Sequence, residues 1–150
     1  LLPYGEIRDI DENSPALTYN KIGSHISRFV RTKVVSTLSP WFAHSEVGDI
    51  YTLPVSHSEG RFVAGEDTVM ELAAKGQIAT QYVDLDGNPS PEVPYNPFGS
   101  ICAIEAVTSP DGRVLGKITH SERIGNYLYK NIPGLKEQNI FKAGVDYFTK

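Results

Sequence analysis

Short apolar segments separated by turn residues recur along the whole chain. Between residues 28 and 38, Val30, Val34 and Leu38 fall on one side of an extended backbone, and cationic residues lie between them on the other. A repeat of two residues predicts a half-buried β-strand. Further strands are predicted by similar segments at 47–55, 77–84, 101–107 and 113–118.

Two segments follow a helical rather than an extended pattern. Residues 68–74 form a short helix-like segment that ends at Gly76, where a helix C-terminal cap is expected. Residues 136–148 predict an amphipathic helix whose inner face carries Ile140, Phe141, Val145 and Phe148. Because helix, glycine and strand follow one another between residues 68 and 84, the chain is predicted to belong to the α/β class.

A long segment between two predicted strands, residues 84–100, holds four of the ten prolines of the chain. Loops of this length inside a compact domain are usually functional or disordered. Proline restricts the unfolded backbone, so this composition favours an ordered, functional loop.

Composition narrows the function classes. At 150 residues with 40% hydrophobic positions, the chain corresponds to one domain or most of one. The net charge is −4 and the 14 Lys and Arg residues are scattered, which argues against a nucleic-acid partner. No apolar run approaches the ~18 residues of a membrane span. A single cysteine favours a reducing, cytoplasmic compartment. The Leu1-Leu2 start and the lone Met70 predict a piece of a longer protein.

The strongest candidate chemistry follows the last predicted strand. His120 and Glu122 lie two residues apart, so they point the same way in an extended chain. A carboxylate at that spacing can hold an imidazole in one tautomer and stabilise its charged form, as in a nucleophile–base–acid triad. The alternative is a surface histidine beside a surface glutamate.

A second polar cluster and a single cysteine are further candidates for chemistry. His57, Glu59 and Arg61 follow another predicted strand and form either a pocket wall or an exposed turn. No further ligand at a usual spacing makes them a metal site. A nucleophile elbow needs small residues on both sides, whereas Cys102 lies in an apolar segment. Cys102 is therefore predicted to be an inert core thiol.

Four segments of the sequence resemble a known family of enzymes. The sequence Thr-His-Ser-Glu-Arg at 119–123 resembles the His-x-Glu-Arg signature of class I glutamine amidotransferases. The segments 54–62, 81–84 and 96–100 are similar, in order and spacing, to the glutaminase domains of phosphoribosylformylglycinamidine synthases, enzymes of purine biosynthesis. The resemblance covers nearly the whole chain. It implies a flavodoxin-like open α/β sheet flanked by helices, with the site at the carboxyl ends of strands.

The resemblance also implies a reaction. A cysteine thiolate would attack the side-chain amide of glutamine, His120 would move the proton, and Glu122 would orient His120. The ammonia would pass to synthetase domains, where ATP and magnesium support amination of formylglycinamide ribonucleotide. Expected partners are therefore glutamine and the synthetase domains, with no cofactor in this chain. Expected pocket residues are His57, Glu59, Arg61, Asn96, Gly99 and Ser100.

The chain departs from the family pattern at three places. Thr119 and Ser121 stand where the family often has proline, and Phe98 stands where asparagine is usual. The family's Gly-x-Cys-Asn-Gly elbow, expected ahead of the segment matched by residues 1–5, has no counterpart in this sequence.

These departures decide what the chain is expected to do by itself. Residues 1–150 are predicted to be the C-terminal part of a glutaminase domain, inactive alone, with the elbow and the synthetase domains elsewhere. Two alternatives stay open. One is a non-catalytic amidotransferase-like module that binds or scaffolds. The other is a hydrolase whose cysteine or serine comes from another chain.

Overall fold

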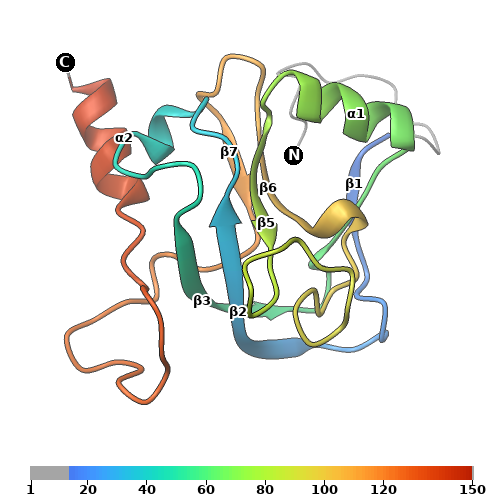
Figure 1. Cartoon of the computed structure of the whole chain (residues 1–150), viewed down its shortest axis with the longest axis horizontal. Coiled ribbons are helices and arrows are strands. Elements are labelled where there is room, and N and C mark those ends of the chain that lie inside the picture. Colours follow the sequence, from blue (N-terminus) through green and yellow to red (C-terminus); the bar gives the residue numbers. More distant parts are fainter. Residues whose placement is uncertain (1–13, 150) are drawn as a thin grey trace.

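The computed structural model describes residues 14–149, and its central element is a five-stranded sheet. Its strands are β2 (Ile26–Val34), β3 (Ile50–His57), β5 (Ile78–Tyr82), β6 (Ile104–Thr108) and β7 (Leu115–Lys117). They pair in the order β3-β2-β5-β6-β7, and every neighbouring pair is antiparallel (Figure 1). The predicted strand segments therefore belong to one connected sheet, as expected.

The other elements lie around this sheet. β1 (Ala16–Thr18) and β4 (Arg61–Val63) form a separate antiparallel pair. Helix α1 (Glu66–Ala74) and helix α2 (Ile140–Phe148) lie at opposite ends of the molecule in Figure 1. Two short 3-10 helices, η1 (Pro40–Phe42) and η2 (Ile101–Ala103), complete the set. The described residues combine helices and a sheet, as the α/β prediction expected, but the sheet is antiparallel throughout, whereas a flavodoxin-like sheet is mainly parallel.

The alternation along β2 has the predicted consequence. Val30 and Val34 are buried on one face, while Arg31 and Lys33 reach the loop beyond β5. Arg31 donates to the carbonyl of Asp84 at 2.5 Å, and Lys33 donates to that of Gly87 at 2.6 Å. The proline-containing loop is thus tied to the sheet at its start. The predicted strand is too long at its end, because β2 stops at Val34, and Leu38 beyond it is exposed rather than buried.

The inner face of α2 differs from the prediction. Ile140, Ala143 and Gly144 are the buried positions, whereas Phe141, Val145 and Phe148 are exposed. The cause is the indole ring of Trp41, which approaches so closely that a Cβ on Gly144 would lie 2.3 Å from it. The helix therefore packs through its small residues, and the expected apolar face was wrong apart from Ile140.

Cys102 is exposed, so the prediction of a core thiol was wrong. Strand β6 begins only at Ile104, after Cys102 and Ala103 have adopted φ angles of 49° and 55°. Non-glycine residues rarely adopt positive φ, and two in succession turn the chain sharply between the loop and the strand. An apolar segment that contains such a turn cannot be a continuous buried strand.

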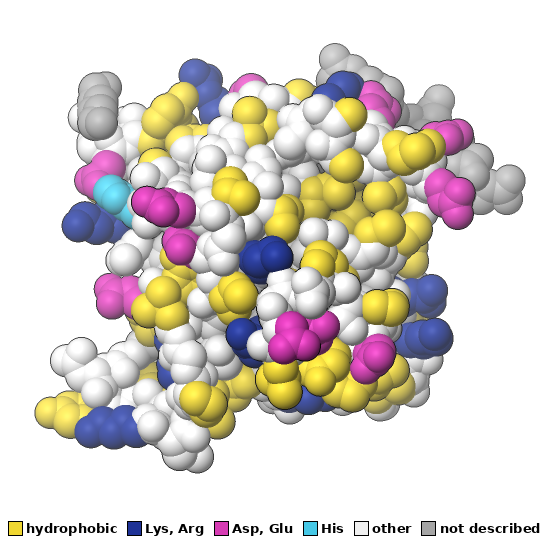
Figure 2. All heavy atoms as spheres, in the orientation of Figure 1, with side chains coloured by type: hydrophobic (Ala, Val, Ile, Leu, Met, Phe, Trp, Pro, Cys, Tyr) yellow, Lys and Arg dark blue, Asp and Glu magenta, His cyan; other side chains and the backbone are white. Residues whose placement is uncertain are grey.

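Charged side chains of both signs are dispersed over the face shown in Figure 2, without a large basic area. Within residues 14–149, no helix has the length and apolar character needed to cross a membrane.

Candidate functional site

The candidate site lies where the chain leaves β7 and passes the outer edge of β3. The backbone N–H of His120 donates to the carbonyl of Pro54 at 2.9 Å. Pro54 lies in an edge strand, where the missing N–H of proline is tolerated and its carbonyl remains available. This contact holds the main chain of His120 against β3, a strand that lies far from it in the sequence.

His120 and Glu122 form the pair that their spacing predicted. His120 Nδ1 lies 2.7 Å from Glu122 Oε1. An ionised carboxylate only accepts hydrogen bonds, so Nδ1 carries the proton and Nε2 is left with a lone pair. Nε2 is buried and has no hydrogen-bond partner within the described part of the chain. The arrangement presents an oriented imidazole whose basic nitrogen is free to exchange a proton.

The carboxylate of Glu122 is held in its charged form. Partial burial alone would raise the pKa of Glu122, but hydrogen bonds from its own backbone N–H and from His120 outweigh this and lower it. Arg123, whose Nε is 3.9 Å from Glu122 Oε1, acts in the same direction. Glu122 can therefore stabilise a positive charge on His120.

The ring of His57 lies flat against the ring of His120. Their centroids are 4.8 Å apart and the planes differ by only 8°. His57 Nε2 donates to the carbonyl of Ile118 at 2.7 Å. Burial lowers the pKa of His57, and the nearby His120, Arg123 and His25 lower it further, against the opposing effect of the Ile118 carbonyl. These effects favour the neutral form of His57 beside His120.

Phe98 supports His57 from another side. Its ring meets the His57 ring edge to face, at 6.0 Å and 72°, and Phe98 is fully buried. The close approach requires Gly60, because a Cβ there would lie 2.8 Å from the Phe98 ring. The residue that replaces the family's usual asparagine is therefore part of the apolar packing behind the site.

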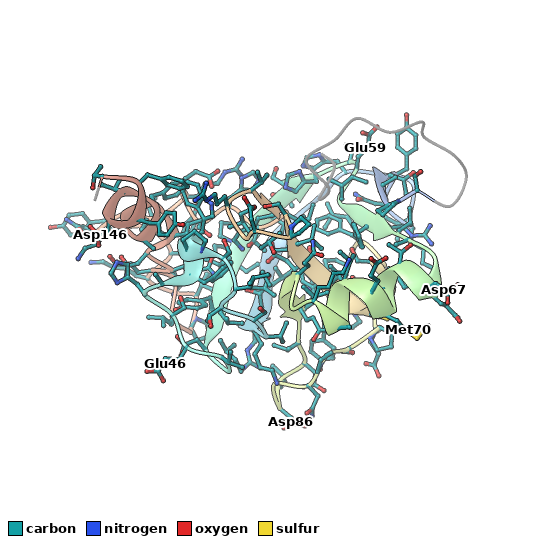
Figure 3. All side chains as sticks on the ribbon, turned by 90° about the horizontal axis from the view of Figure 1, so that it is seen from above. Glu46, Glu59, Asp67, Met70, Asp86 and Asp146 are labelled. Carbon is teal, nitrogen blue, oxygen red and sulfur yellow. The ribbon has the colours of Figure 1, made fainter. Side chains whose placement is uncertain are left out.

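The remaining predicted pocket residues have other surroundings. Asn96 and Ser100 are buried and close the loop on itself, through Asn96 Nδ2 to Ser100 O at 2.8 Å and Ser100 N to Asn96 Oδ1 at 3.1 Å. Arg61 Nε donates to the Gly99 carbonyl at 3.3 Å. Glu59 is exposed, at the edge of the molecule in Figure 3. The structure thus brings His57 to His120. Asn96 has its partners within its own loop, and the hydroxyl of Ser100 accepts from the backbone N–H of Phe62 at 3.1 Å.

A buried ion pair beneath the site escaped the sequence analysis. Glu105 on β6 and Lys117 on β7 lie 3.1 Å apart, and their side chains are 0% and 7% exposed. Glu105 Oε1 also accepts from the backbone N–H groups of Ile118 at 3.0 Å and Thr119 at 2.6 Å, and Oε2 accepts from Thr80. Glu105 lies inside the apolar segment 101–107, and a charged residue in such a segment is the sequence feature that could have indicated a buried ion pair.

The charged form of Glu105 is favoured despite its burial. Burial alone would raise the pKa of Glu105, but the Lys117 ammonium and the hydrogen bonds from Thr119 and Thr80 lower it overall. Burial lowers the pKa of Lys117, and the Glu105 carboxylate opposes that effect. The pair holds the segment that leads into His120.

Both departures beside His120 make contacts that proline could not make. The backbone N–H of Thr119 donates to Glu105. The hydroxyl of Ser121 donates to Gln138 Oε1 at 2.7 Å, inside the fold. Since proline lacks both an N–H and a hydroxyl, these two positions are adapted to the local hydrogen bonding.

Residues 14–149 contain no group of three or more His, Cys, Asp or Glu side chains placed to hold a metal ion.

A mostly apolar cavity of about 410 Å³ lies between β1, β4, β6 and β7, and its lining reaches Ile118. Figure 2 shows hydrophobic side chains gathered on the viewed face beneath α1.

Comparison with known proteins decides the family. The family model for the CobB/CobQ-like glutamine amidotransferase domain matches residues 1–148. The chain belongs to this family. It is 33% identical, over 90% of its length, to phosphoribosylformylglycinamidine synthase subunit PurQ of Pyrococcus horikoshii, of which it covers 56%. It is 32% identical to the same subunit of Methanococcus maripaludis, over 95% of its length and 58% of that protein.

A solved structure supports the fold assignment. PurLQS from Thermotoga maritima contains a chain that matches with a TM-score of 0.65 and 24% identity, over 90% of this chain and 53% of that one. The fold of this glutamine amidotransferase family member is therefore shared with a solved structure. The chain spans just over half the length of the PurQ relatives described above.

Proposed function

We propose that this chain supplies the acid–base half of a glutaminase site, with His120 as the proton carrier and Glu122 as its orienting partner. One observation carries the proposal: His120 Nδ1 is paired with Glu122 at 2.7 Å, while the buried Nε2 has no partner among the described residues. Buried polar atoms are nearly always satisfied, so an unpartnered basic nitrogen points to a group that arrives from outside the described residues.

The proposed reaction needs a cysteine nucleophile, and residues 1–150 contain no Gly-x-Cys-Asn-Gly elbow that would carry it. His120 Nε2 takes the thiol proton, and Glu122 stabilises the resulting imidazolium. The thiolate attacks the amide carbon of glutamine, and His120 returns the proton to the departing nitrogen as the C–N bond breaks, which yields ammonia and a thioester. Water then attacks the thioester while His120 accepts its proton, and glutamate leaves as the thiol is restored.

The wider proposal is that residues 1–150 are the C-terminal part of a glutaminase domain of a phosphoribosylformylglycinamidine synthase. In that enzyme the ammonia would serve an ATP- and magnesium-dependent amination of formylglycinamide ribonucleotide, performed in the cytoplasm by synthetase domains or subunits. The names of the PurQ relatives and their similarity over most of this chain support this proposal. By itself, the chain is expected to release no glutamate from glutamine.

The test uses the full-length protein that carries this chain. His120→Ala should lower glutamine-dependent synthesis by roughly 10²–10⁴-fold, the usual contribution of a positioned general acid–base. Synthesis from free ammonia should fall by much less, because it bypasses cleavage of the amide. Cys102→Ser is the matched control and should change neither rate.

The comparison of the two nitrogen sources separates chemistry from folding, since a destabilised protein loses both rates together. Equal loss of both rates in His120→Ala, with an unchanged melting temperature, would show that His120 is not the glutaminase base. Loss of glutamine-dependent synthesis in Cys102→Ser would show that the nucleophile lies inside this chain.

A further inference from the structure

His57 takes no part in the proton transfers proposed above, yet its ring stacks on the ring of His120. The two imidazoles are stacked at 4.8 Å with nearly parallel planes. His57 Nε2 is used by the Ile118 carbonyl, so this nitrogen is not available to a substrate. The contact with His120 is therefore made by the face of the His57 ring.

The His57 ring is itself held from several directions. Its hydrogen bond to Ile118 at 2.7 Å fixes the ring plane, and the buried Phe98 packs against it edge to face. The same strand, β3, accepts the backbone N–H of His120 through Pro54. One strand thus contacts both the main chain and the ring face of the proposed proton carrier.

We propose that His57 is a positioning residue that holds the His120 imidazole, through face-to-face stacking, in the orientation that leaves Nε2 free. This inference rests on the proposed function. The hydrogen bond to Glu122 alone leaves the His120 ring able to tilt about the Nδ1–Oε1 direction. A flat neighbour at stacking distance opposes that tilt, because the ring would have to move into His57 or away from it.

The charges around His57 suit this role. Burial lowers the pKa of His57, and the neighbouring His120, Arg123 and His25 lower it further, which favours its neutral form. A neutral ring can lie against the His120 imidazolium without direct charge repulsion. Glu122, on the Nδ1 side of His120, supplies the compensating negative charge.

Three variants of His57 in the full-length protein separate stacking from hydrogen bonding. His57→Ala removes both, His57→Phe keeps a flat ring, and His57→Gln keeps an N–H donor without a ring. Glutamine hydrolysis should lose about 10- to 100-fold in kcat in the Ala and Gln variants, with KM changed by less than about threefold, because misplacement of a catalytic group mainly affects the chemical step. The Phe variant should stay within about threefold of the natural protein in kcat.

His44→Ala is the matched control, since His44 pairs with Asp146 on α2, at the other end of the molecule from Glu59 in Figure 3. It should leave kcat and KM unchanged. Recovery of kcat by His57→Gln but not by His57→Phe would overturn the stacking proposal, and so would an unchanged kcat in His57→Ala. His120→Ala is measured alongside. If His120→Ala abolishes hydrolysis while the His57 variants keep it, only the His57 proposal fails. If His120→Ala leaves hydrolysis intact, the proposed function fails.

Discussion

The short segment 117–122 contributes to two pairs of acidic and basic side chains, Glu105–Lys117 and His120–Glu122. The two pairs differ in how many of their polar atoms have hydrogen-bond partners. Glu105 and Lys117 are buried, and both oxygens of Glu105 accept from several donors. His120 and Glu122 lie at the surface side of the same segment, with side chains 19% and 53% exposed. In this second pair, one imidazole nitrogen has a partner and the other has none.

The difference separates a structural pair from a chemical one. A buried charge costs free energy unless it is paired and hydrogen-bonded, so a fully satisfied ion pair holds a segment in place and has no capacity left for a ligand. The pair with an unsatisfied nitrogen retains the capacity to accept a proton. Similar residue types thus perform different tasks because of what surrounds them.

The largest expected effect comes from breaking the buried pair. Lys117→Met leaves Glu105 buried without its cation and should lower the free energy of unfolding by about 3–5 kcal/mol. Lys75→Met is the matched control, because Lys75, directly after α1, forms an exposed ion pair with Glu71 at 2.5 Å. It should cost less than about 1 kcal/mol. Urea unfolding of both variants measures the difference, and equal losses would contradict the structural role.

The pH dependence of the same variants sharpens this test. In the natural protein the pKa of Glu105 is lowered, so its stabilising contribution is present above the ordinary carboxyl pKa of about 4.3 and is lost as the pH falls through the lower folded value. Without Lys117, burial is unopposed by a cation and should raise that pKa. Urea unfolding at several pH values should therefore show the Lys117→Met variant gaining stability relative to the natural protein as the pH falls toward the ordinary carboxyl pKa.

A smaller effect is expected where the segment departs from its family. Thr119→Pro restores the family's usual residue but removes the N–H that donates to Glu105 at 2.6 Å. It should destabilise the fold by about 1–3 kcal/mol more than Thr119→Val, which keeps the N–H and loses only the hydroxyl. Thermal unfolding of the two variants makes the comparison. A proline variant as stable as the valine variant would mean that Glu105 does not depend on this donor.

Local patterns in the sequence predicted the sheet and the main pair of the candidate site. The period of two around Val30 and Val34 is a local property, and it gave a strand whose buried face is the expected one. The spacing of His120 and Glu122 is also local, and the two side chains meet at 2.7 Å. Such features survive folding because neighbouring residues determine them.

The features that the sequence did not predict depend on contacts between distant segments. His57 stacks on His120, and no local spacing signals that contact. The inner face of α2 was set by Trp41, which lies about a hundred positions earlier in the chain and leaves room only for Gly144. Cys102 was misplaced because positive φ angles cannot be read from an apolar segment.

The central claim is that His120 and Glu122 act as one unit in glutamine cleavage. Glutamate release is measured for the full-length protein and for the His120→Ala, Glu122→Gln and doubly substituted variants. Because Glu122 acts only through His120, the double variant should be no slower than His120→Ala, within about threefold, and Glu122→Gln alone should lose less than His120→Ala. Losses that multiply in the double variant would show that the two side chains act independently and would contradict the claim.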